Sequence, residues 1–172
     1  AAYSSVETAV VAFADDAQCA ADFTTPDRMD LPELQAGGLT DMGAGLTMAL
    51  DLLEKRKSQY KTAGVDYYQP ILVVMSDGFP NGDPALLKQA EERILQQTGE
   101  RRLTVVAVGI GPNADMETLA HLSPRQKPLY LGGLQFREFF AWLSRSMNRV
   151  SVSLPGDEPE LVRQGAGHGF RW

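Results

Sequence analysis

The chain has 172 residues, of which 44% are hydrophobic and 22% charged, enough for one ordinary α/β domain with its own core. Sixteen basic and 22 acidic residues give a net charge of −6, and no stretch concentrates lysine and arginine. This composition excludes nucleic acid and membrane as expected partners, and a single cysteine excludes an internal disulfide, so we expect a cytoplasmic protein.

The first third of the chain predicts two strands and a helix. Residues 6–13 and 18–23 are separated by a short acidic turn, which is typical of an antiparallel pair. A loop with prolines and acids follows and ends in the stretch GGLTD at residues 37–41. A helix is expected over residues 42–57, with its leucines on one face. Residues 58–69, which contain three tyrosines, are predicted to form an irregular insert.

Residues 70–83, with the sequence PILVVMSDGFPNGD, organise the middle of the chain. Residues 71–75 are all apolar, which is typical of a parallel strand covered by helices on both faces. Asp83 is a good N-cap and Pro84 a good first residue for a helix that ends near Gly99. Residues 103–108 predict a second buried parallel strand.

Three shorter elements complete the pattern. A short helix begins at Asn113 or Asp115, a short strand covers residues 128–131, and a last helix covers residues 136–150. The helical stripe predicted to face the core contains Phe136, Phe140, Leu143, Met147 and Val150.

This order of elements predicts an α/β fold. Three αβ units after a strand pair are typical of a doubly wound, mostly parallel sheet with helices on both faces. We expect one domain over residues 1–150 and a tail or linker over residues 151–172, where proline, glycine and charge replace the apolar pattern.

Two loops carry oxygen ligands at the sheet edge where ligands bind in such folds. Thr40 precedes the first long helix, and Asp77 follows the strand of residues 71–75. A hydroxyl and a carboxylate beside glycines suit a hard cation such as Mg²⁺, and oxygen ligands alone argue against zinc or copper. The residues leave a second interpretation open, in which Thr40 caps the following helix and Asp77 caps a turn.

Several blocks of sequence resemble a known family. They are VETAVVAF, AGGLTDMGAGLTMALDLL, PILVVMSDGFPNGD, LTVVAVGIGPNADMETL and the aromatic last helix. In order and spacing they resemble a von Willebrand factor A domain, and most closely the bacterial tellurite-resistance TerY-like branch. The resemblance covers residues 6–150 and implies a Rossmann-like fold.

The resemblance also implies a metal-ion-dependent adhesion site. Such a site holds Mg²⁺ or Mn²⁺ on three loops, and a carboxylate of a protein partner completes it. Thr40 and Asp77 match the second and third loops. The first-loop motif, DxSxS, does not occur in the 172 residues. The resemblance begins after the family's first central strand, so we expect a gap in the sheet unless another segment fills it.

Three functions remain open at this point. The first is a protein-binding module that bridges Mg²⁺ between Thr40, Asp77 and an acidic residue of the partner. By resemblance it would serve bacterial stress or tellurite resistance, with kinase or phosphatase partners. The second is a metal-independent scaffold that uses the aromatic residues of the insert and tail. These are Tyr60, Tyr67, Tyr68 and Trp172. The third is a Mg²⁺-dependent phosphoryl-transfer enzyme that uses Asp77. It is favoured least, because no second acid, lysine or nucleophile accompanies Asp77 in the sequence. We therefore expect that the protein is not an enzyme.

Overall fold

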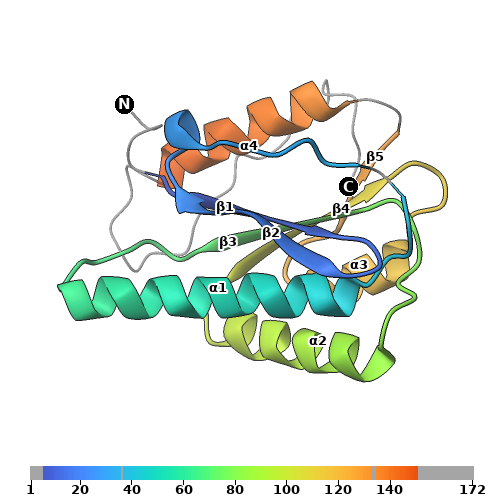
Figure 1. Cartoon of the computed structure of the whole chain (residues 1–172), viewed down its shortest axis with the longest axis horizontal. Coiled ribbons are helices and arrows are strands. Elements are labelled where there is room, and N and C mark those ends of the chain that lie inside the picture. Colours follow the sequence, from blue (N-terminus) through green and yellow to red (C-terminus); the bar gives the residue numbers. More distant parts are fainter. Residues whose placement is uncertain (1–5, 36, 133–134, 151–172) are drawn as a thin grey trace. The chain divides into compact units, whose positions relative to one another are not determined.

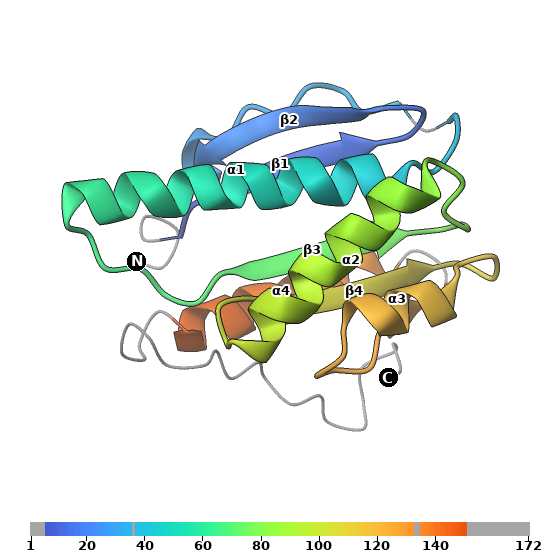
Figure 2. The same cartoon turned by 90° about the horizontal axis from the view of Figure 1, so that it is seen from below.

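The computed structural model describes residues 6–35, 37–132 and 135–150 (Figures 1 and 2). The chain divides into two compact units. Of the described residues, the first unit contains 6–67 and Pro80–Glu92, and the second contains Tyr68–Phe79 and 93–150. The predicted tail of residues 151–172 lies outside the described residues.

The first unit contains a strand pair packed on a long helix. Strands β1 (Thr8–Phe13) and β2 (Ala17–Thr24) are antiparallel, as predicted, with Phe13 opposite Ala17 in the register. Helix α1 (Met42–Ala63) runs alongside both strands (Figure 2). A Cβ atom at Gly45 would lie 2.6 Å from a ring carbon of Phe13, so this glycine allows α1 to approach β1 closely.

Helix α1 extends beyond the predicted end. It continues through residues 58–63 and stops at Gly64, whose left-handed φ of 66° lets its N–H donate to the carbonyl of Lys61. The expectation of an irregular insert over all of residues 58–69 is therefore wrong. Its first six residues contain neither glycine nor proline, so nothing in them ends the helix before Gly64.

The loop between β2 and α1 contains one short helical turn, η2 (Pro26–Arg28). Helix α2 (Pro84–Gly99) begins as predicted, since the side chain of Asp83 accepts a hydrogen bond from the N–H of Ala85 at 2.8 Å.

The second unit contains a parallel sheet. Strands β3 (Ile71–Ser76), β4 (Thr104–Ile110) and β5 (Leu129–Leu131) lie in the order β3-β4-β5, with Val73 opposite Val106. The parallel α/β fold is thus confirmed, and the described strands form two sheets, β1-β2 and β3-β4-β5. Helix α3 (Met116–Leu122) begins at Asp115, whose side chain accepts from the N–H groups of Glu117 and Thr118.

Helix α4 (Phe136–Val150) covers the core of the second unit, and Phe136 and Leu143 of the predicted stripe pack against the core cluster. Phe139 and Trp142 are buried, whereas Phe140 is 50% exposed. The core cluster consists of Val106, Val108, Leu129, Leu131, Phe139 and Trp142. The prediction was wrong at Phe140. Positions 139 and 140 both fit a helical stripe that contains residues 136 and 143, so the spacing alone does not tell which of the two phenylalanines is buried. The side chain of Val150 lies outside the described part of the chain.

Candidate functional site

The loop that carries Thr40 is held against the turn between β1 and β2. The carboxylate of Asp15 accepts a hydrogen bond from the N–H of Leu39 at 2.7 Å. The N–H of Asp41 donates to the carbonyl of Ala14 at 2.8 Å. Gly38 has a φ of +82°, and a Cβ there would lie 2.9 Å from both carboxylate oxygens of Asp15, so only glycine fits this close approach.

Asn81 holds the other side of the same loop. Its side-chain oxygen accepts a hydrogen bond from the N–H of Thr40 at 2.6 Å, and its own N–H donates to the carbonyl of Thr40 at 3.1 Å. Sequence reasoning missed Asn81. The available signal was an asparagine in the PNGD turn, because asparagine side chains often accept backbone hydrogen bonds in loops.

The side chain of Thr40 does not cap helix α1. The N-cap is Asp41, whose carboxylate accepts from the N–H of Ala44 at 3.0 Å, so the capping interpretation of Thr40 is wrong. Thr40 is half-buried, and its hydroxyl makes no hydrogen bond with any other residue that the structure describes. The loop is thus fixed through the backbone of Thr40 and not through its hydroxyl.

Asp77 lies in the second unit, directly after β3, and is exposed. The polar contacts of this turn are made by its neighbour: the hydroxyl of Ser76 donates to the carbonyl of Gly78 at 3.2 Å. Within the described ranges the Asp77 carboxylate has no hydrogen bond or ion pair, so the turn-capping interpretation fails here too. Thr40 and Asp77 belong to different units.

The chemistry of these two side chains fits a hard cation. A hydroxyl and a carboxylate without internal hydrogen bonds are oxygen donors that Mg²⁺ accepts, but Mg²⁺ needs about six ligands. No group of three or more His, Cys, Asp or Glu side chains that could hold a metal ion occurs among the described residues. Each side chain could therefore supply one oxygen ligand, and a metal ion would need further ligands.

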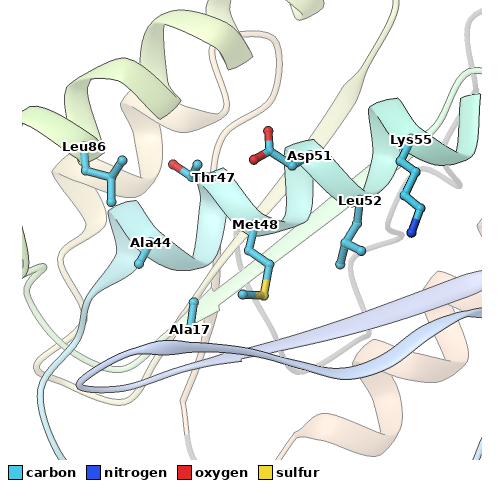
Figure 3. Close-up of a pocket in the computed structure, with 8 residues that line it drawn as sticks. All are labelled: Ala17, Ala44, Thr47, Met48, Asp51, Leu52, Lys55 and Leu86. Atoms are coloured by element: carbon cyan, nitrogen blue, oxygen red, sulfur yellow. The ribbon is translucent and has the colours of Figure 1, made fainter. Parts of the chain in front are cut away.

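A second feature of the first unit is an open pocket of about 510 Å³ on helix α1 (Figure 3). Its lining residues are Ala17, Ala44, Thr47, Met48, Asp51, Leu52, Lys55 and Leu86. Met48 and Leu52 point toward the β1-β2 hairpin, whereas Thr47 and Asp51 point away from it (Figure 3). The lining is mostly apolar and holds neither histidine nor cysteine, so it suits contact with an apolar group better than catalysis.

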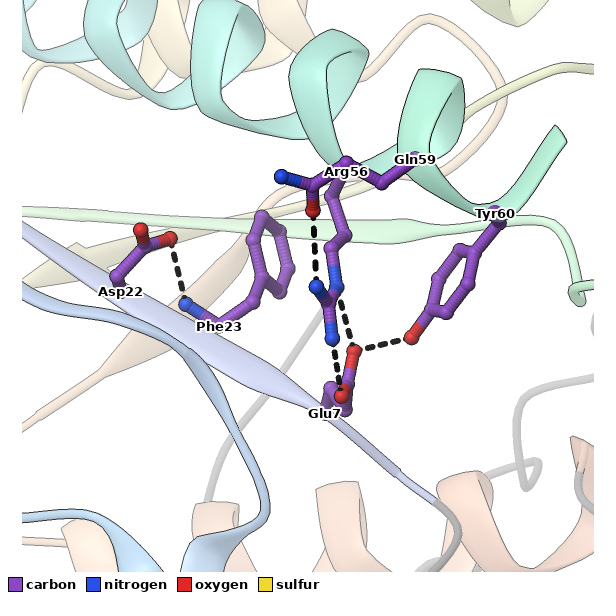
Figure 4. Close-up of polar contacts among 6 residues, drawn as sticks. All are labelled: Glu7, Asp22, Phe23, Arg56, Gln59 and Tyr60. Carbon is purple, nitrogen blue, oxygen red and sulfur yellow. Dashed lines mark hydrogen bonds and ion pairs between the residues drawn. The ribbon is translucent and has the colours of Figure 1, made fainter. Parts of the chain in front are cut away.

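A polar cluster ties the start of the described chain to the end of helix α1 (Figure 4). Arg56 donates from Nε to Glu7 at 2.7 Å and also forms an ion pair with it, and the hydroxyl of Tyr60 donates to the same carboxylate. The hydrogen bond from Arg56 lowers the pKa of Glu7. Burial, followed by the bond to Glu7, raises the pKa of Tyr60.

This cluster uses the tyrosines of the predicted insert inside the first unit. The ring of Tyr60 stacks on that of Tyr67 with centroids 5.7 Å apart, and the Arg56 guanidinium lies 4.9 Å from the Tyr60 ring centre. Tyr60 therefore stabilises the packing of α1. Of the two other aromatic residues proposed for partner contact, Tyr68 is half-buried and Trp172 lies outside the described residues.

Comparison with known proteins gives one family. The model of the von Willebrand factor type A domain matches residues 2–131. No match was found among curated proteins. Among solved structures, a crystal structure of an uncharacterized membrane spanning protein from Vibrio fischeri is 18% identical over 81% of this chain and 75% of that chain, with a TM-score of 0.35. That likeness is too weak to carry an argument. In the part of the chain that the structure describes, no helix has the length and apolar character needed to cross a membrane.

Proposed function

Because the chain belongs to the von Willebrand factor type A domain family, whose members are usually non-enzymatic interaction modules, we propose that it binds a protein partner through Mg²⁺ or Mn²⁺. In this proposal Thr40 and Asp77 are two of the metal ligands. The partner contributes a carboxylate, and the other ligands come from a DxSxS segment outside these 172 residues.

The observation that carries the proposal is the bridge between Asn81 and Thr40. Asn81 follows Asp77 by four residues in the sequence, and its two hydrogen bonds hold the backbone of Thr40. Asn81 and Thr40 both belong to the first unit, so the bridge fixes the backbone of one proposed ligand within that unit. A ligand backbone held in this way loses little freedom when a metal binds, which favours affinity.

The state of the two side chains also supports the proposal. Asp41, rather than Thr40, caps helix α1, and Ser76, rather than Asp77, makes the polar contacts of its turn. Metal binding would therefore break no hydrogen bond that stabilises either loop. The carboxylate of exposed Asp77 and the carboxylate of the partner would repel each other. A cation that lies between them would remove this repulsion.

Metal binding is tested by titrating the purified chain with Mn²⁺ in the presence of a synthetic peptide that contains a DxSxS motif. We expect one Mn²⁺ per chain, with affinity at least about tenfold lower in Thr40→Val and in Asp77→Asn. Asp66→Asn, which removes one exposed carboxylate elsewhere, is the control and should bind like the unmodified chain. Equal Mn²⁺ affinity in Asp77→Asn and Asp66→Asn would overturn the assignment, as would the absence of binding to the unmodified chain.

The finer biological role is proposed from the sequence blocks alone. We place the module in the bacterial cytoplasm, in a stress or tellurite-resistance system with kinase or phosphatase partners. The test compares tellurite sensitivity of cells carrying the unmodified gene with cells carrying Asp77→Asn. Equal sensitivity of these two strains and of a strain lacking the gene would count against that role.

A metal-independent scaffold is the alternative, but one of the four aromatic residues that motivate it already has a partner within the chain: the hydroxyl of Tyr60 donates to Glu7. Partner binding that persists undiminished in EDTA would favour it. An enzyme is supported by no observation at Asp77. Metal-dependent turnover of phosphate esters that Asp77→Asn abolishes would revive that hypothesis.

A further inference from the structure

The net charge of the chain is concentrated in one fifth of its length. Residues 8–41 contain seven acidic side chains and one basic side chain, whereas the rest of the chain contains 15 of each. These 34 residues therefore carry the whole net charge of −6. Within them, residues 25–41 connect β2 to α1, and we call the described residues 25–35 and 37–39 of this connection the strap.

The strap also exposes apolar side chains. Leu31, Leu34 and Leu39 are 47%, 54% and 55% exposed. Asp27, Asp30 and Glu33 stand exposed in the same segment. Burying one leucine side chain fully would contribute about 1.5–3 kcal/mol, so three exposed leucines within nine residues are a candidate contact surface.

The strap begins in a local turn and is tied to the β1-β2 turn near its other end. The N–H of Arg28 donates to the carbonyl of Thr25 at 2.9 Å within the turn η2, and the N–H of Leu39 donates to Asp15. Between these ends, none of the described residues 30–38 donates its backbone N–H to another backbone carbonyl. A segment held in this way presents its leucines and backbone with part of the ordering cost already met.

We propose that the strap docks a cationic, amphipathic segment of a partner protein. Apolar side chains of the segment would cover Leu31 and Leu34, and its lysines or arginines would pair with Asp30 and Glu33. Charge complementarity selects this occupant, because an anionic lipid surface or a nucleic acid would be repelled. A second copy of the chain would be repelled too, because its own strap is equally acidic.

This contact is independent of the metal site, and its test separates the two. The probe is a fluorescent peptide of leucine and lysine in amphipathic helical order, titrated against the full chain with anisotropy as the readout. A second peptide, with glutamate in place of lysine, is the negative probe. We expect the lysine peptide to bind, more tightly at low salt, with equal affinity in EDTA and in Mn²⁺, and the glutamate peptide not to bind.

Two pairs of variants test the named residues. Leu31→Ser/Leu34→Ser should weaken binding at least about tenfold, whereas Leu95→Ser, which removes a leucine of 47% exposure from helix α2, should change it less than about twofold. Asp30→Lys/Glu33→Lys should also weaken binding at least about tenfold. Asp66→Lys/Glu92→Lys makes the same change of net charge at exposed positions outside the strap and should cost much less.

Three results would overturn the proposal. The first is no binding of the lysine peptide to the unmodified chain. The second is an equal loss in the two charge-reversed variants, which would mean attraction by net charge alone. The third is an unchanged affinity in Leu31→Ser/Leu34→Ser. Circular dichroism of each variant confirms that it is folded.

Discussion

The backbone of Thr40 is bridged to Asn81 by two hydrogen bonds of 2.6 and 3.1 Å, which join residues 41 positions apart in the sequence. In one bond Asn81 accepts through its side chain, and in the other it donates through its backbone. The loop before helix α1 is thereby fixed without the side chain of Thr40. A substitution that removes the Thr40 hydroxyl would therefore leave the two hydrogen bonds that hold this loop in place.

The first prediction follows from that bridge. Asn81→Ala removes the acceptor for the N–H of Thr40 and should lower the free energy of unfolding by about 0.5–1 kcal/mol, because water can only partly replace an acceptor in this exposed hydrogen bond. Urea unfolding measures this loss, and hydrogen exchange at the Thr40 amide should become faster. Asn81→Asp keeps an acceptor oxygen and should retain slow exchange. Equally slow exchange in Asn81→Ala would contradict the bridge.

The second prediction concerns pH. The hydrogen bond from Arg56 holds the pKa of Glu7 below its usual value of 4.5. The unfolded chain therefore binds a proton at Glu7 more readily than the folded chain does. The stabilisation from the Glu7 carboxylate is complete above the unfolded pKa and is lost as pH falls through the lower folded value.

We therefore expect the free energy of unfolding to fall more steeply below about pH 5 in the unmodified chain than in Glu7→Gln, with a difference on the order of 1 kcal/mol. Urea titrations from neutral to acid pH measure both slopes. Asp66→Asn controls for the loss of one negative charge. Parallel slopes for the unmodified chain and Glu7→Gln would show that the Glu7–Arg56 pair contributes nothing to the free energy of unfolding.

The third prediction concerns the contact between α1 and α2 at Gly43 in the first unit. A Cβ atom there would lie 2.6 Å from the backbone nitrogen of Leu87, and a backbone atom cannot rotate away. Gly43→Ala should destabilise the protein by about 1–3 kcal/mol, although alanine favours helix by about 1 kcal/mol. Gly99→Ala is the matched control, since a Cβ at Gly99 meets nothing within 4 Å. If Gly43→Ala were as stable as Gly99→Ala, the close approach would be wrong.

The fourth prediction uses two adjacent phenylalanines of helix α4. Phe139 is fully buried in the core cluster, so Phe139→Ala should cost about 3–5 kcal/mol of unfolding free energy. Phe140 is 50% exposed and touches Phe139 edge-on with ring centroids 5.3 Å apart, so Phe140→Ala should cost about 1 kcal/mol. Chemical denaturation of both variants measures the two losses. A larger loss in Phe140→Ala than in Phe139→Ala would mean that Phe140 is buried, as the sequence predicted.

Local patterns in the sequence determined most of the elements and both proposed ligand positions. The apolar run of residues 71–75 predicted β3, and Asp83 with Pro84 predicted the start of α2, because strand burial and helix capping depend on residues that are neighbours in the chain. The same local logic placed Thr40 before a helix and Asp77 after a strand.

Only the tertiary structure decided which residues support those positions. Asn81 and Asp15 hold the Thr40 loop from 41 and 24 residues away, and no local pattern encodes a contact over that distance. It also decided the buried face of α4, because apolar residues at both 139 and 140 satisfy the helical period, and packing against β4 and β5 selects Phe139. Periodicity defines a stripe on a helix, but the neighbouring strands determine which side of that stripe is covered.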